Sequence, residues 1–456
     1  MRLSPFLLCA FLALAGPVMA DQVDDAVRAE MKRIHIPGVS VLVLKDGKVI
    51  KEKGYGLANV EHNVPVTPQT VFQSGSVGKT FTAALVLLLA EDGKLSIDDP
   101  VSRHLANTPK VWESITIRHL LTHTSGLADP YEELDFRKDY TDEELIAVEA
   151  GIPMLFAPGE AYSYSNMGYH LLGFICNKVG GKFYGDQLRE RIFAPLGMST
   201  RIISESDIVP HRAAGYEWSK RKLVNQSWVS PGLNTTADGS LYLTAKDLAI
   251  WDAAMQTDKI LNAKMRAASF TPATLKNGSK IGYGYGWQLA SVNGHPSIGH
   301  GGWQGFKSQM TRYVDDKLTV IVLANSAAAS YDRLTNAVAR QYVPALATLK
   351  PKAIADSEPA VTAQVRELLS QLMRGAITPG QLSDKAAAVF TQAHVKAMAE
   401  RLADQGALKQ IELLERSVEG ETRNYRYRFI MADEILVSTV KFDKANRVDQ
   451  FTLRPE

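Results

Sequence analysis

Cysteine is scarce in this chain of 456 residues, which contains only Cys9 and Cys176. Residues 1–20 have the plan of a secretory leader, with a positive end at Arg2, an apolar core and a small-residue cleavage signal that ends at Ala20. Removing this leader removes Cys9, so the mature chain cannot form an internal disulfide. Cys176 lies in an apolar stretch, and we interpret it as a small buried side chain rather than a reactive thiol.

The chain also lacks a long apolar run after the leader, and it has no marked excess of one charge. The formal net charge is +2, and losing Arg2 with the leader lowers it to +1. Such a balance does not indicate nucleic acid or an anionic surface as a partner. No later stretch is long and apolar enough to span a membrane. The sequence therefore predicts an exported protein, periplasmic or secreted, without a membrane span.

Strand patterns at both ends of a helical region predict an α+β architecture. Asp46-Gly47 is typical of a tight hairpin turn and separates two strand patterns, and further patterns return late in the chain. The expected strands are 39–45, 48–57, 283–290, 306–314 and 318–324. Residues 80–270 between them look mostly helical. We therefore expect an antiparallel sheet flanked by helices, with a helical region inserted and the site where the two parts meet.

The composition changes near residue 350, where proline and charged residues indicate a linker. We predict a main domain over 21–349, a linker over 350–359 and a small accessory α+β domain over 360–456. Aromatic side chains alternate with arginines over 425–429, so one face of that strand is apolar and the other basic. We interpret the basic face as a solvated sheet face.

Ser76-x-x-Lys79 stands where small residues give way to a long apolar run of good helix formers. Lys79 would then lie one helical turn from Ser76 on the same side. A serine hydroxyl becomes a good nucleophile when a neighbouring base takes its proton, and a buried lysine can be that base. Two other motifs fail here: a P-loop would need glycine where Gln73 stands, and a nucleophile elbow would need glycine at Ser74.

Two later motifs supply partners for Ser76. Tyr164-x-Asn166 lies in a turn before a predicted helix, and His300 begins a glycine-rich stretch beside a strand pattern. Taken singly, the first is typical of a helix N-cap and the second of a bend with a structural histidine.

Taken in order, Ser76-x-x-Lys79, Tyr164-x-Asn166 and His300-Gly301-Gly302 resemble the three motifs of the penicillin-recognising serine hydrolases. This family includes class C β-lactamases, DD-peptidases, esterases and D-aminopeptidases. Supporting stretches also match in order, at 95–101, 115–127 and 239–248. The resemblance covers residues 23–347, implies the β-lactamase/transpeptidase-like fold and leaves the accessory domain uncovered.

The resemblance implies a role for each motif. Ser76 would attack an acyl carbonyl, Lys79 and Tyr164 would share its proton, and Lys79 would hold the phenol near ionisation. Backbone N–H groups of Ser76 and Trp303 would bind the oxyanion. The site residues implied are catalytic Ser76, Lys79 and Tyr164, and substrate-binding Asn166, His300, Gly301, Gly302 and Trp303.

The third motif bears on the substrate. Many β-lactamases of this family have Lys-Thr-Gly there, where a cation and a hydroxyl help to hold a carboxylate, but this chain has His300-Gly301-Gly302. We expect His300 to be largely neutral near pH 7, which weakens selection for acidic lactams. We therefore expect a hydrolase that acts through an acyl-enzyme on esters, amides or short peptides, including those with D-residues, with weak or no β-lactam hydrolysis.

Two alternatives stay open. One is an efficient class C-like β-lactamase or a DD-carboxypeptidase. The other is a non-catalytic sensor or scaffold that binds peptidoglycan fragments or lactams. The expected partner in each case is a small molecule or a short peptide. No cofactor or metal is expected, because Leu120 stands between His119 and His123 where the zinc-protease motif has glutamate.

Overall fold

The computed structural model describes residues 22–202, 207–347, 351–378 and 380–456. The predicted leader, residues 1–20, lies outside the described residues. Within the described ranges, no helix combines the length and the apolar character that crossing a bilayer requires.

The main sheet is antiparallel and has the strand order β3-β2-β1-β12-β11-β10-β9. Its strands are β1 (Gly38–Lys45), β2 (Lys48–Asn59), β3 (Val64–Pro65), β9 (Gln288–Val292), β10 (His295–Trp303), β11 (Lys307–Tyr313) and β12 (Leu318–Ala324). Because β1 pairs with β12, the sheet is assembled from both ends of this region, as expected. The turn residues Asp46 and Gly47 both have positive φ, as the predicted hairpin requires.

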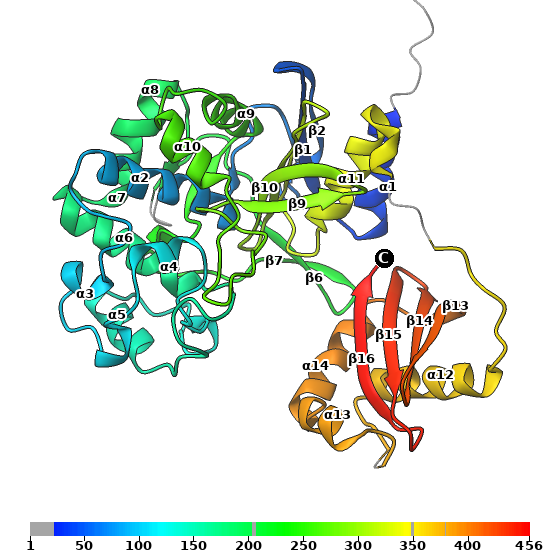
Figure 1. Ribbon diagram of the computed structural model, residues 1–456. Coiled ribbons are helices and arrows are strands. Elements are labelled where there is room, and N and C mark those ends of the chain that lie inside the picture. The colour runs from blue at the N-terminus through cyan, green and yellow to red at the C-terminus, as the bar shows by residue number, and fades with distance from the viewer. Residues whose placement is uncertain (1–21, 203–206, 348–350, 379) are drawn as a thin grey trace, which may run out of the picture.

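Helices cover both faces of this sheet (Figure 1). On one face α1 (Gln22–Arg33) and α11 (Tyr331–Tyr342) pack on Val41 and Val322. On the other face Leu42 and Leu323 belong to a larger core that contains the apolar side chains of α2 (Lys79–Glu91). Both sides of the central strands are therefore buried, which explains their continuous apolar sequences.

The inserted region is mostly helical, as expected. Its other helices are α3 (Val101–His104), α4 (Ile117–Leu121), α5 (Asp142–Ala150), α6 (Asn166–Gly180), α7 (Tyr184–Leu188), α8 (Ala194–Leu196), α9 (Ala245–Ala254) and α10 (Ala263–Ser269). Its short helical turns are η1 (Gly75–Gly78), η2 (Lys110–Trp112), η3 (Pro130–Glu132), η4 (Arg189–Phe193) and η5 (Leu233–Thr235), and η6 (Pro344–Leu346) follows α11. Small sheets β4-β8-β5 and β6-β7 complete it, with β4 (Phe72–Gln73), β5 (Arg201–Ile202), β6 (Tyr216–Ser219), β7 (Lys222–Asn225) and β8 (Leu241–Leu243).

Two expected features of the late strands differ. The strand predicted over 283–290 begins only at Gln288, because Gly286 has φ +77° and interrupts extended structure before it. The glycine-rich stretch at His300, typical of a bend, is instead part of the continuous strand β10.

A separate sheet follows, with the order β13-β14-β15-β16, and it stands apart from the main sheet in Figure 1. Its elements are α12 (Pro359–Met373), α13 (Asp384–Val389), α14 (Gln392–Ala403), β13 (Leu408–Glu419), β14 (Thr422–Met431), β15 (Ile435–Phe442) and β16 (Val448–Pro455). Its apolar core contains only residues from 361 onward. Before α12, the backbone N–H of Ile354 donates to Leu413 O over 2.8 Å, so this segment lies along β13.

The basic face of this sheet is not simply solvated, which corrects the sequence interpretation. Arg428 is buried and its guanidinium donates to Glu412, Glu456 and the main-chain oxygen of Pro351 over 2.6–2.9 Å. Alternation predicted which side chains share the face, but it could not show that carboxylates from neighbouring segments cover Arg428.

Candidate active site

Ser76 and Lys79 lie at the junction of two helical elements. Ser76 is in η1, and α2 begins directly after it at Lys79. Ser76 is partly exposed, whereas the Lys79 side chain has no exposed surface. Lys79 Nζ lies 3.1 Å from Ser76 Oγ. The structure therefore places the Lys79 amine beside the Ser76 hydroxyl, which was predicted from the sequence to be the nucleophile.

The Lys79 amine has two further partners. It donates to Asn166 Oδ1 over 2.6 Å and to the main-chain oxygen of Asp238 over 2.7 Å. Burial lowers the pKa of Lys79 to about 8, although the charges of Asp238 and Asp129 act in the opposite direction. When the amine loses a proton, its two remaining N–H groups still donate to Asn166 Oδ1 and to the main-chain oxygen of Asp238. The lone pair of the nitrogen then faces Ser76.

Tyr164 lies just before α6, with its ring centroid 5.1 Å from Lys79 Nζ. Its hydroxyl is buried and has no hydrogen bond of acceptable geometry within the described residues. Burial raises the pKa of Tyr164 well above 10, although Ser76 lies close enough to lower it in part. The phenol is therefore neutral at pH 7, which differs from the expectation that Lys79 holds it near ionisation.

Asn166, the first residue of α6, is buried and uses both ends of its amide within the protein. Its Nδ2 donates to Asp129 Oδ2 over 2.8 Å, while its Oδ1 accepts from Lys79. In this arrangement Asn166 orients the amine.

The third motif lies on β10, which packs directly against η1. A Cβ on Gly302 would collide with Ser74 O and lie 2.9 Å from Ser76 N. A Cβ on Gly75 would likewise collide with the Trp303 N–H group, and Gly75 has φ +49°. These close approaches require glycine and bring the backbone of Trp303 beside the turn that carries Ser76.

His300 is almost fully buried, and both of its ring nitrogens are engaged. Nε2 lies 2.8 Å from the Tyr283 hydroxyl, and Nδ1 lies 2.6 Å from Gly301 O. Because a carbonyl only accepts, Nδ1 carries the proton and Nε2 accepts from the tyrosine. Burial, with a smaller contribution from Lys79, lowers the pKa of His300 to about 3, so the side chain is neutral as expected.

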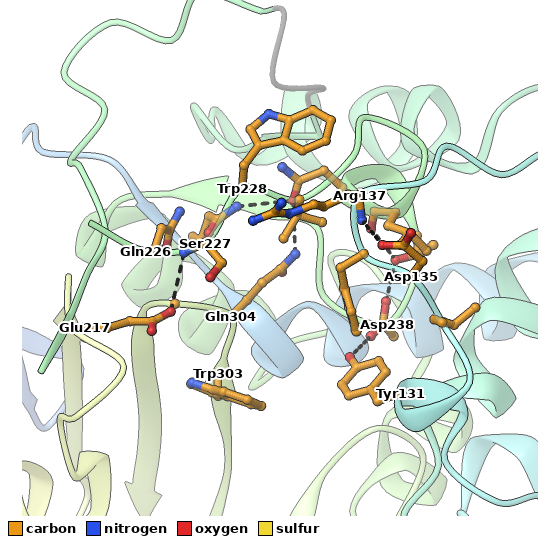
Figure 2. Close-up of a pocket in the computed structure, with 18 of the residues that line it drawn as sticks. Tyr131, Asp135, Arg137, Glu217, Gln226, Ser227, Trp228, Asp238, Trp303 and Gln304 are labelled. Atoms are coloured by element: carbon orange, nitrogen blue, oxygen red, sulfur yellow. Dashed lines mark hydrogen bonds between the residues drawn. The ribbon is translucent and has the colours of Figure 1, made fainter. Parts of the chain in front are cut away.

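A cavity of about 680 Å³ opens beside this centre. Figure 2 shows Trp303, Trp228, Gln304 and Tyr131 around it, with Asp238 beside Tyr131. Trp303 is 56% exposed. Of the site residues predicted from sequence, Trp303 lines this cavity and the others do not.

Sequence reasoning missed several residues that the fold brings to the site, namely Asp129, Tyr131, Glu149, His170 and Asp238. Asp238 directly precedes one of the stretches that carried the resemblance, and His170 lies one helical turn after Asn166. This closeness to recognised motifs in the sequence was the signal that could have identified Asp238 and His170. It could not show that Glu149 lies beside His170.

The two histidines tested as metal ligands have structural contacts. His119 Nδ1 accepts from Thr116 N over 3.2 Å at the start of α4, and His123 Nδ1 accepts from Ser165 N over 3.1 Å. Over the part of the chain that the structure describes, no group of three or more His, Cys, Asp or Glu side chains could hold a metal ion.

The chain is similar to several known proteins. The family model described as Beta-lactamase matches residues 23–343. Penicillin-binding protein 4* of Bacillus subtilis (strain 168) is 32% identical over 309 residues, 63% of this chain and 67% of that protein. A D-aminopeptidase of Gluconobacter oxydans (strain 621H) is 31% identical over 349 residues, 73% of this chain and 65% of that protein. This chain thus spans about two thirds of the length of these relatives.

Among solved structures, the octameric penicillin-binding protein homologue from Pyrococcus abyssi matches with a TM-score of 0.66 at 24% identity. The match covers 95% of this chain and 96% of that chain. It shows the same fold, including the C-terminal sheet.

Proposed function

Because the chain belongs to the beta-lactamase family and is similar to a D-aminopeptidase, we propose that it is an exported serine hydrolase. It acts through a covalent acyl-enzyme on esters, amides or short peptides, including those with D-residues, and hydrolyses β-lactams weakly or not at all. The observation that carries this proposal is the 3.1 Å contact between a buried amine, Lys79 Nζ, and the partly exposed Ser76 Oγ.

The proposed reaction begins with transfer of the Ser76 proton to the neutral amine of Lys79 while Oγ bonds to the acyl carbon. The neutral Tyr164 hydroxyl passes a proton to the leaving group as its bond to the acyl carbon breaks, and Lys79 replaces that proton. Backbone N–H groups of Ser76 and Trp303 hold the oxyanion. The same groups, acting in reverse, deliver water to the acyl-enzyme.

The substrate preference follows from His300. Its imidazole is neutral, and both ring nitrogens are engaged within the protein. It therefore supplies no charge-assisted hydrogen bond to a substrate carboxylate. Such hydrogen bonds are among the stronger polar contacts, so acidic lactams should bind less well without one. Small activated esters and short amides need only the nucleophile, the proton transfer and the oxyanion site.

Covalent labelling with a fluorophosphonate probe tests the nucleophile. We expect mass spectrometry to find the label on Ser76, and Ser76→Ala to lose it while keeping its circular dichroism spectrum. Ser163→Ala, which changes a serine beside Tyr164, is the matched control and should label normally. A label on another residue would contradict the assignment.

The substrate class is tested by comparing kcat/KM for a short-chain aryl ester and a chromogenic cephalosporin. The ester should be hydrolysed faster. A cephalosporin value near the diffusional range of ~10⁸ M⁻¹s⁻¹ would favour the class C-like alternative instead. Lactam binding without acylation or turnover of either compound would favour the sensor.

A further inference from the structure

The buried side of the site contains charged side chains that the proposed reaction does not use. His170 of α6 is 2% exposed and lies between Glu149 of α5 and Asp238, in the turn before β8. Figure 2 shows Asp238 and the Tyr131 hydroxyl directed toward one another at the edge of the cavity. Three elements far apart in sequence thus bring two carboxylates to one imidazole.

Both ring nitrogens of His170 face a carboxylate. Nδ1 lies 2.6 Å from Glu149 Oε1, and Nε2 lies 3.3 Å from Asp238 Oδ1. A neutral imidazole can donate from only one nitrogen, whereas an imidazolium donates from both. Since buried carboxylates without a cation are costly, this geometry favours the imidazolium.

Asp238 connects this imidazolium to the proposed base. Its carboxylate accepts from the Tyr131 hydroxyl over 3.0 Å and from Thr236 Oγ1 over 2.6 Å. Its main-chain oxygen accepts from Lys79 Nζ, and its Oδ2 lies 4.0 Å from the same nitrogen. A change in the position or charge of Asp238 therefore acts directly on Lys79.

We propose that His170 is a positioning residue of this active site: as an imidazolium between Glu149 and Asp238, it holds Asp238 against Lys79 and offsets the carboxylate charge. Lys79 can then lose a proton near neutral pH and accept one from Ser76. The proposal rests on the proposed function, because it assigns His170 a role in the same proton transfer.

The electrostatic surroundings agree with this geometry. Burial alone would lower the pKa of His170, but Asp238 and Glu149 raise it to about 10. The tyrosines and histidines around His170 and Lys79 are neutral at pH 7, because burial raises the pKa of each tyrosine and lowers that of each histidine: Tyr131, Tyr164, Tyr169, Tyr184, His123 and His300. The local charge balance is thus set by His170, Lys79 and the carboxyl groups of Glu149, Asp129 and Asp238.

The pH profile of kcat/KM for His170→Gln distinguishes a positioning role of His170 from a role in packing alone. Glutamine keeps a polar side chain but cannot carry the charge, so the Asp238 carboxylate would act on Lys79 uncompensated and favour the protonated amine. We expect the acid limb of kcat/KM for a short aryl ester to move up by about one pH unit, a loss of roughly tenfold at pH 7 that is recovered at alkaline pH.

Two further variants sharpen this test. Adding Asp238→Asn to His170→Gln removes the uncompensated carboxylate and should move the acid limb back toward lower pH. His104→Gln is the matched control, because His104 Nε2 also lies 2.9 Å from a carboxylate, Asp99 Oδ2, but in α3, outside the active site. It should leave the acid limb in place.

A loss of activity in His170→Gln that is equal at every pH would overturn the proposal. If that variant does not fold, ¹⁵N NMR of the wild-type imidazole decides: both ring nitrogens should be protonated at pH 7, and a single neutral tautomer would overturn it. The NMR result does not depend on any substrate. A failed labelling of Ser76 would therefore count against the proposed function, and a neutral His170 against this inference.

Discussion

At the scale of single residues, the site depends on one buried amine with three partners. Asn166 and Asp238 each fix one N–H group of Lys79, and the remaining position faces Ser76. Burial lowers the pKa of this amine, while the same burial raises that of Tyr164. These opposite shifts support the proposal that Lys79 is the base and that the neutral Tyr164 relays a proton.

The pH dependence of kcat/KM should follow Lys79. In the proposed reaction the deprotonated amine is the active form, so kcat/KM should rise with pH and level off above the pKa of about 8. Tyr164 and His300 should add no further limb between pH 5 and about 9, since one titrates well above this range and the other below it. The measurement is a pH series with an uncharged ester. A profile that is flat from pH 6 to 9 would exclude Lys79 as the base.

At the scale of elements, the site depends on how closely β10 approaches η1. Gly302 and Gly75 let the two backbones touch, and Ser308 Oγ on the neighbouring strand β11 donates to Ser74 O. The oxyanion site proposed for Ser76 and Trp303 therefore exists only while these two elements remain in contact.

Gly302→Ala should separate β10 from η1. Its Cβ would meet backbone atoms that cannot move independently, so we expect destabilisation of about 1–3 kcal/mol and a large fall in kcat. Urea unfolding and ester kinetics measure both. Gly168→Ala in α6 is the control, because its Cβ would meet only ordinary contacts near 3.7 Å, and it should keep activity. Full activity in Gly302→Ala would show that this contact is not needed.

At the scale of the whole molecule, the described apolar cores divide along the chain. Those around the main sheet contain residues between Val23 and Leu346, whereas the core under the C-terminal sheet begins at Val361. The two parts are joined by ion pairs, in which Glu434 accepts from Arg33 and Arg333. All the site residues lie before the second part.

A chain of residues 21–347 should therefore fold and hydrolyse a short ester. Arg33 and Arg333 would keep Glu30 as a partner after losing Glu434, so we expect only a modest fall in Tm. Circular dichroism melting and ester kinetics provide the test. An insoluble chain, or a folded but inactive one, would show that the C-terminal part supports the site.

Much of the fold followed from local sequence. Asp46-Gly47 required positive φ and therefore a hairpin, and the apolar run after Lys79 predicted a buried helix, both confirmed. The strand expected over 283–290 was wrong over 283–287, because Gly286 has a left-handed conformation that a strand pattern does not reveal.

The sequence by itself determined the nucleophile and base candidates, because Ser76 and Lys79 are one helical turn apart and their proximity is a local property. It also placed a neutral His300 in the third motif. Only the tertiary structure decided that Glu149 and Asp238 enclose His170, and that Asp238 in turn holds Lys79. Such contacts join residues many positions apart. They depend on helix packing, and burial then sets their charges, so no spacing along the chain could encode them.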